Sequence, residues 1–198
     1  LYVLVGKSYA QSEITEIKYG VGAGISNSYI WRGLKWGGIG SQISGNINYC
    51  NFNLELFGRT SFYDNYRELD FIFSYKGKSF SISLGDYWSK DDDPNKYFTL
   101  KNHLLETEIL YVNNYIPLTL SWNTVLFGED FSSKGKRLFS SYLELCYQFT
   151  ISKFNMECSL GITPWENSIL ETEKFGLTNL KGSINKEITI SNLCMSIG

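Results

Sequence analysis

The stretch ISGNINYCNFNLEL, residues 43–56, alternates apolar and polar side chains on both sides of the tight joint Cys50–Asn51. Ile47 and Tyr49 stand at alternate positions before the joint. Leu54, after the joint, falls on the same face of the predicted hairpin. Because successive side chains of a strand point to opposite faces, this spacing predicts a β-hairpin with one apolar and one polar face. The rest of the fold is predicted by extending this unit in both directions.

The same alternation runs from Ile17 to about Ile188, and short joints between the segments take turns with longer ones. The short joints are Cys50–Asn51, Lys76–Lys78, Asn113–Tyr115, Ser152–Lys153 and Ser191–Leu193. The longer joints are Leu34–Ile39, Ser89–Lys101, Gly128–Lys136 and Pro164–Lys174, with Tyr63–Tyr66 of middle length. Short turns at one end and long loops at the other are typical of a bacterial outer-membrane β-barrel.

The two faces of the predicted strands differ in the same way along the chain. In the first strand, predicted from about Ile17 to Arg32, Tyr19 and Val21 oppose Gly20 and Gly22. A regular apolar face edged with aromatic residues is expected to meet lipid, with the polar face lining the interior. The predicted aromatic belt at headgroup level comprises Tyr29, Trp31, Tyr49 and Tyr75. The predicted lumen-lining residues are Lys18, Arg32, Glu55, Arg59, Glu68, Asp70, Glu106, Glu108, Glu144, Glu157, Lys181 and Glu187.

The composition excludes two classes of protein. Apolar residues make up 43% of the 198 residues, but no run reaches the roughly 18 apolar residues of a membrane-spanning helix. The 18 basic residues are balanced by 20 acidic ones without a basic block, which argues against a nucleic-acid partner. Aromatic residues reach 16%, in keeping with β-structure and interfacial belts.

The fold predicted from these patterns is an all-β, antiparallel, up-and-down transmembrane barrel of about twelve strands. Ten strands are complete, and an eleventh begins near Cys194. Because such barrels usually have an even number of strands, C-terminal strands are expected to be missing from this chain. Residues 1–10 resemble the end of a secretory signal, with Ser8-Tyr9-Ala10 as a cleavage site, so residues 11–198 form the single predicted domain.

The segment Ser26-Asn27-Ser28-Tyr29-Ile30-Trp31-Arg32-Gly33 resembles the first strand of a family of bacterial outer-membrane proteins of unknown function. Members of that family have an S-x-Y-x-(W/F)-R-G first strand after a signal peptide. Phe175 to Ile188 is similar to a late strand of the same family. The resemblance implies a barrel in the bacterial outer membrane and implies no activity.

The residues that could support catalysis are few. His103 is the one histidine, beside Asn102 and Leu104, and alternation places it on the lipid-facing side, where Asp91–Asp93 could approach it. A lipid-modifying enzyme would need such a histidine to act with a serine or a carboxylate. No serine motif accompanies His103, so the protein is predicted not to be an enzyme, and catalysis on lipid is the less favoured alternative.

No metal, cofactor or disulfide is predicted. The run Asp91–Asp93 lacks the spacing of an EF-hand loop, so a solvated acidic loop is favoured over a calcium site. No C-x-x-C spacing occurs. Cys146 belongs to the polar face and Cys158 to the apolar face, so the two thiols cannot meet across the sheet. All four cysteines are therefore expected to be free.

The predicted function is a small passive channel of porin type for ions or small polar solutes. The acidic excess on its inner face would favour cations. Apart from these solutes, the expected partner is outer-membrane lipid. Glu106 and Glu108 face the interior side by side and need a basic partner, for which Arg59 and Lys181 are candidates. The alternative is a barrel filled by its own ionic network, structural or interacting through its surface. Tyr87, Phe127 and Tyr142 could also narrow the bore.

Overall fold

The computed structural model describes residues 3–5, 17–90, 97–99, 102–190 and 193–197. Within these ranges the chain is all-β and contains no helix. Consistent with this, no helical segment long and apolar enough to span a membrane occurs in the described part of the chain. The strands are β1 (Val3–Val5), β2 (Lys18–Ser26), β3 (Tyr29–Trp31), β4 (Leu34–Gly37), β5 (Gly40–Tyr49), β6 (Phe52–Ser61), β7 (Arg67–Lys76), β8 (Phe80–Lys90), β9 (His103–Val112), β10 (Leu118–Phe127), β11 (Ser141–Ile151), β12 (Phe154–Thr163), β13 (Gly176–Ile190) and β14 (Leu193–Ile197).

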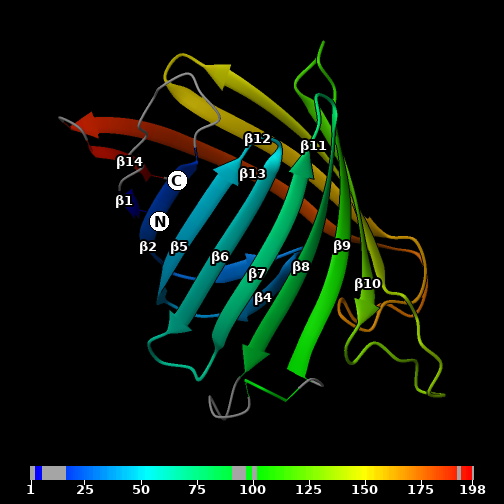
Figure 1. Cartoon of the computed structure of the whole chain (residues 1–198). Helices are drawn as coiled ribbons and strands as arrows, with labels where there is room; N and C mark the ends of the chain where they lie inside the picture. Colours follow the sequence, from blue (N-terminus) through cyan, green and yellow to red (C-terminus); the bar gives the residue numbers. More distant parts are fainter. Residues whose placement is uncertain (1–2, 6–16, 91–96, 100–101, 191–192, 198) are drawn as a thin grey trace.

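Twelve of these strands form one antiparallel sheet in the order β1-β14-β13-β12-β11-β10-β9-β8-β7-β6-β5-β2. From β5 to β14 each strand pairs with its neighbour in the chain, which is an up-and-down meander. Figure 1 shows the sheet curving so that its two end strands come to the same side. β1 lies beside β2 there, but no hydrogen-bonded ladder joins these two strands within the described residues. The predicted all-β antiparallel architecture is confirmed.

The connections alternate in length, as expected. Cys50–Asn51 joins β5 to β6, and Ser152–Lys153 joins β11 to β12. Cys50 and Ser152 have φ of 51° and 58°, in the left-handed region that lets a chain reverse within two residues. The long connections 128–140 and 164–175 lie together at the opposite end of the sheet (Figure 1).

The outer face of the curved sheet is apolar and exposed. Large apolar side chains on β2 and on each strand from β5 to β13 are exposed, for example Val21 at 68% and Ile43 at 64%. Polar residues on the alternate positions are buried, among them Asn53, Arg59 and Asp70. The chain therefore places its polar side chains inside and its apolar side chains outside.

The predicted first strand is wrong beyond Ser26. β2 ends at Ser26, and Tyr29–Gly37 fold into the hairpin β3–β4, which forms a separate two-stranded sheet. Arg32 and Gly33 form the hairpin turn with φ of 50° and 88°, and two positive φ values are what a two-residue type I′ turn requires. The hairpin lies inside the curve of the large sheet rather than extending it (Figure 1).

Candidate functional site

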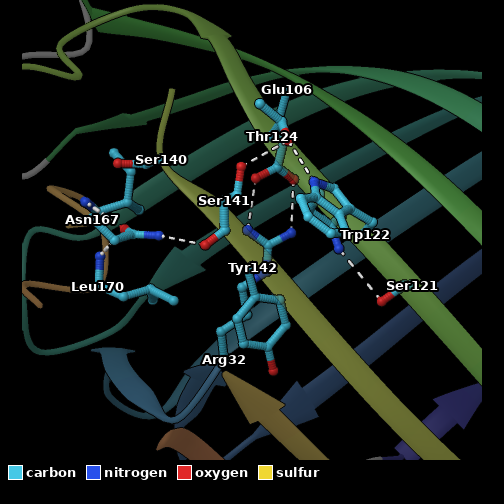
Figure 2. A network of polar contacts seen from close by, with 12 residues as sticks. Arg32, Glu106, Ser121, Trp122, Thr124, Ser140, Ser141, Tyr142, Asn167 and Leu170 are labelled. Atoms are coloured by element: carbon cyan, nitrogen blue, oxygen red, sulfur yellow. Dashed lines mark hydrogen bonds and ion pairs between the residues drawn. The ribbon is translucent and has the colours of Figure 1, made fainter. Parts of the chain in front are cut away.

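The centre of the interior is an ion pair between the hairpin and the sheet wall. Arg32 donates from Nη1 and Nη2 to the two carboxylate oxygens of Glu106 on β9, at 2.6 and 2.7 Å. The two side chains are 11% and 2% exposed. Figure 2 shows the fork of the guanidinium facing the carboxylate, the geometry in which an arginine–carboxylate pair is strongest.

Two aromatic rings also contact the Arg32 guanidinium. Arg32 lies 4.1 Å from the ring centre of Trp31 and 4.7 Å from that of Tyr142, within the range of cation–π attraction. The Tyr142 hydroxyl donates to Glu144, which also accepts a 2.9 Å hydrogen bond from Asn179. The hairpin turn thus contacts β9 and β11 directly, and β13 supports the β11 side chains through Asn179.

The turn also fits closely against the backbone of β13. A Cβ atom at Gly33 would lie 2.0 Å from the carbonyl oxygen of Thr178, so only glycine can occupy this position without a shift. Its positive φ adds a second reason for glycine. A similar contact occurs on the wall, where the Tyr142 hydroxyl lies over Gly161. These glycines give room for the interior side chains.

A second polar cluster fixes the base of the hairpin. Arg59, 4% exposed, donates to the Ser26 hydroxyl at 2.7 Å and to the Gly38 carbonyl at 2.6 Å. These two residues flank the hairpin, so Arg59 holds both of its ends. The Arg59 guanidinium lies 5.1 Å from the ring centre of Tyr29, whose hydroxyl donates to Glu68 at 3.2 Å.

A third pair lies towards the short-turn end and is more open. Lys181 donates to Glu157 at 2.7 Å, with side chains 52% and 24% exposed, and Gln148 donates to the same carboxylate. This end of the interior holds a polar hollow of about 390 Å³ that is bordered by Gln148 and Asn185. The hairpin therefore fills the interior near the long loops and leaves space near the short turns.

The structure brings much of the predicted lumen set together. Arg32, Glu106, Glu108 and Glu144 gather around the hairpin turn, while Arg59, Glu68 and Asp70 gather at its base. The base that compensates Glu106 is Arg32, so the proposed pairing with Arg59 or Lys181 is wrong. Lys18 and Glu55 are on the same inner register as Asn48 and Asn46. The side chain of Glu187 lies outside the described residues.

The predicted belt is only partly on the outer face. Tyr49 and Tyr75 are exposed there, 49% and 44%, beside the short turns. The prediction is wrong for Tyr29 and Trp31. They belong to the inner hairpin, where Tyr29 contacts Glu68 and Trp31 contacts Arg32. Of the three residues expected to narrow the bore, Tyr87 and Tyr142 face inward, Tyr87 against Trp31 of the hairpin, whereas Phe127 is 45% exposed. A register shift at the end of β10 accounts for Phe127.

An aromatic cavity of about 160 Å³ lies between the hairpin and the sheet at the long-loop end. It was not predicted, because its walls come from distant segments. Burial raises the pKa of the Tyr66 phenol, with Glu68 adding to the effect, so this hydroxyl stays protonated at neutral pH. The cavity is lined by Tyr29, Trp31, Trp36, Tyr66, Glu68, Tyr87, Ser89, Asn102, His103, Leu104, Glu129 and Ile169.

The long loops 128–140 and 164–175 are locked to each other by buried hydrogen bonds. Asp130, fully buried, accepts from the Ser140 hydroxyl at 2.6 Å and the Ser168 hydroxyl at 2.7 Å. Asn167 donates to the Ser141 carbonyl, and its Oδ1 accepts from the backbone N–H groups of Ile169 and Leu170 (Figure 2). These hydrogen bonds hold the two loops together at the long-loop end of the sheet.

His103 is held in a structural arrangement. Its Nδ1 lies 3.0 Å from both carboxylate oxygens of Asp86, and its Nε2 faces the carbonyl of Tyr97. Both ring nitrogens therefore already lie against oxygen atoms of the protein. The partner is Asp86, a residue the sequence did not single out, while Asp91–Asp93 lie outside the described residues.

The described cysteines are free, as expected. Cys146 is buried, whereas Cys50 and Cys158 are exposed, and none of the three forms a disulfide. The side chain of Cys194 lies outside the described residues. In the part of the chain that the structure describes, no group of three or more histidine, cysteine or acidic side chains is placed to hold a metal ion.

Comparisons with known proteins find no matching family model, no similar curated protein and no similar solved structure.

Proposed function

We propose that this chain is a β-barrel protein of the bacterial outer membrane, closed at rest by its own β3–β4 hairpin. The apolar face of the sheet supports the membrane location. Exposed large apolar side chains occur on β2 and on every strand from β5 to β13. Water-soluble monomers seldom expose an apolar patch beyond roughly 300–600 Å², whereas lipid requires such a face.

Strand length supports the same location. β5, β6, β7, β9, β10 and β12 each have 10 residues, and β8 and β11 have 11. A tilted strand of about 9–11 residues crosses the hydrocarbon core. Because backbone groups in lipid must be paired, the free edges at β1 and β2 would have to be closed, either by each other or by further strands.

The Arg32–Glu106 pair is the observation that carries the closed state. It holds the hairpin across the interior, and removing one partner of a buried pair costs about 3–5 kcal/mol. An interior filled in this way favours a barrel that is closed at rest over an always-open passive channel. Ions or small polar solutes would pass only after the hairpin leaves its seat. The acidic side chains of the wall would then favour cations.

Two lysine substitutions on β5 test the membrane location. Ile43 faces outward and is 64% exposed, whereas Asn46 faces inward opposite Glu55. A lysine on the lipid face costs about 2–4 kcal/mol at the midplane, while an inward lysine would meet Glu55. Ile43→Lys should reduce membrane assembly and Asn46→Lys should not, as measured by heat-modifiable migration of the membrane fraction. Equal assembly of both variants would contradict the proposal.

Conductance in a planar bilayer tests the closed state. The wild-type protein should insert without producing steady current steps. Long-lived steps from the wild type would show that the hairpin does not close the bore and would restore the passive-channel prediction. A barrel that never conducts, even after the hairpin is loosened, would favour the purely structural alternative.

A further inference from the structure

The aromatic cavity at the long-loop end has the features of a cation-binding site. The ring centres of Tyr29 and Tyr66 are 5.9 Å apart. The ring centre of Trp31 lies 5.9 Å from that of Trp36 and 6.4 Å from that of Tyr87. All five rings line the cavity. Several aromatic rings around one space create a negative potential that attracts an organic cation more than a metal ion.

The cavity also contains buried polar atoms without a hydrogen bond of standard geometry among the described residues. One carboxylate oxygen of Glu68 accepts from Tyr29, and the other is such an atom, with the Tyr66 phenol close to the same carboxylate. The indole Nε1 of Trp36 is likewise buried and unpartnered within the described residues. Buried polar atoms of this kind are uncommon in folded proteins, and a ligand or water would satisfy them.

Acidic side chains outnumber basic ones at this end of the cavity. Glu68 and Asp70 lie near one base, Arg59, which directs its Nη atoms to Ser26, Gln42 and Gly38 rather than to either carboxylate.

Two other basic side chains close to the cavity already have acidic partners. Arg32 is paired with Glu106, and His103 lies against Asp86. Neither therefore cancels the attraction that the cavity would exert on a further cation.

The volume sets the size of the ligand. A protein cavity of about 150 Å³ accepts benzene, and drug-sized ligands need roughly 300–1,000 Å³. The 160 Å³ here therefore suits a compact ligand of a few heavy atoms. A quaternary or primary ammonium with a short polar arm meets this limit.

We infer that the cavity binds a small organic cation of the ammonium class that carries a hydrogen-bond acceptor. The ammonium group lies among the aromatic rings, with Glu68 as its counter-charge. The acceptor of the ligand receives a hydrogen bond from Trp36 Nε1. The same chemistry is found in a free solute such as choline and in a lipid headgroup, so the test includes both sources.

Isothermal titration of the folded protein in octyl glucoside, a detergent without an ammonium group, tests this inference. Choline should bind at least about tenfold more tightly than its uncharged isostere 3,3-dimethylbutan-1-ol. Tetramethylammonium, which lacks the hydroxyl, should bind more weakly than choline. Glycerophosphocholine is titrated in parallel: tighter binding than choline assigns the site to a headgroup, and weaker binding assigns it to a free solute.

Variants separate the roles of the two unpartnered groups. Glu68→Gln should lower choline affinity about tenfold, whereas Glu157→Gln, at the opposite end of the interior, should leave it unchanged. Trp36→Phe keeps a ring but loses the donor, so it should weaken choline about three- to tenfold without affecting tetramethylammonium. Circular dichroism confirms that each variant is folded. Equal binding of choline and its isostere, or binding of neither cation nor headgroup, would overturn the inference.

Discussion

Arg32 and Glu106 are 74 residues apart in the chain and meet inside the sheet through two hydrogen bonds of 2.6 and 2.7 Å. Arg32 lies at the turn of the inner hairpin, and Glu106 lies on β9 of the wall. The pair therefore joins the element that fills the interior to the element that surrounds it. Under the proposed function, the strength of this pair decides how firmly the interior is closed.

Arg32→Ala is expected to open the bore. The substitution leaves Glu106 buried without a partner and removes the contacts of Arg32 with Trp31 and Tyr142. Single-channel recording should show current steps for this variant and none for the wild type. Lys181→Ala breaks a pair of the same chemistry that does not touch the hairpin, so it should remain closed. Steps from both variants would mean that charge loss alone, and not the hairpin, controls conduction.

Gly33→Ala is expected to displace the hairpin without changing any charge. The new methyl would lie 2.0 Å from the Thr178 carbonyl oxygen, on a residue whose φ is 88°. Hydrogen exchange read by mass spectrometry should show faster exchange across 29–37. Gly182→Ala is the control, because nothing lies within 4 Å of a Cβ at that position. Unchanged protection of 29–37 in Gly33→Ala would remove the proposed close fit.

Asn167→Ala is expected to destabilise the loop lock. Asn113 forms the same local motif, with its Oδ1 accepting from the N–H groups two and three residues later, but there the hydrogen bonds are exposed. Asn167 is 3% exposed, so its loss leaves buried groups unpaired. Urea unfolding should show a loss of about 1–3 kcal/mol for Asn167→Ala and under about 1 kcal/mol for Asn113→Ala. Equal losses would mean that the long loops are not locked as described.

Asp64 gives the loop between β6 and β7 a dependence on pH. The Ser61 hydroxyl, which lies beside the carboxylate without a hydrogen bond of standard geometry, and the N–H groups of Gly38 and Tyr66 hold the pKa of Asp64 below its ordinary value. The folded state therefore gains stability from ionised Asp64 above the ordinary pKa, about 3.9. That gain is lost as pH falls through the lowered pKa.

The melting temperature measures this effect. Asp64→Asn should melt below the wild type at pH 6, and the difference should shrink towards pH 2–3. A difference that stays constant with pH would show that ionisation of Asp64 does not contribute.

The faces and ends of the sheet could be predicted from sequence because they depend on local periodicity. Alternation places Ile43 and Leu54 outside and Asn53 inside, since a strand has a period of two wherever it occurs. The joints at Cys50–Asn51 and Ser152–Lys153 are equally local. Each of these features is found in the structure.

The hairpin could not be predicted in the same way. Tyr29 and Trp31 continue the alternation of Ile25, so the pattern alone cannot distinguish a strand that continues from one that folds inward. The difference is decided by Arg32 with Glu106 and by Gly33 with Thr178, which are contacts between distant parts of the chain. The sequence Arg32-Gly33 was the available signal of a turn, because glycine favours the positive φ of a tight turn. The aromatic cavity was missed for the same reason.

The position of the hairpin also fixes an order of events during folding. The residues of the hairpin are synthesised early, but the side chains and backbone that it packs against lie on β9, β11 and β13, which are synthesised much later. Contacts this distant in sequence form late, since the intervening chain must first be ordered. The hairpin must wait until the wall has curved around it, so the Arg32–Glu106 pair can form only after these later strands are in place.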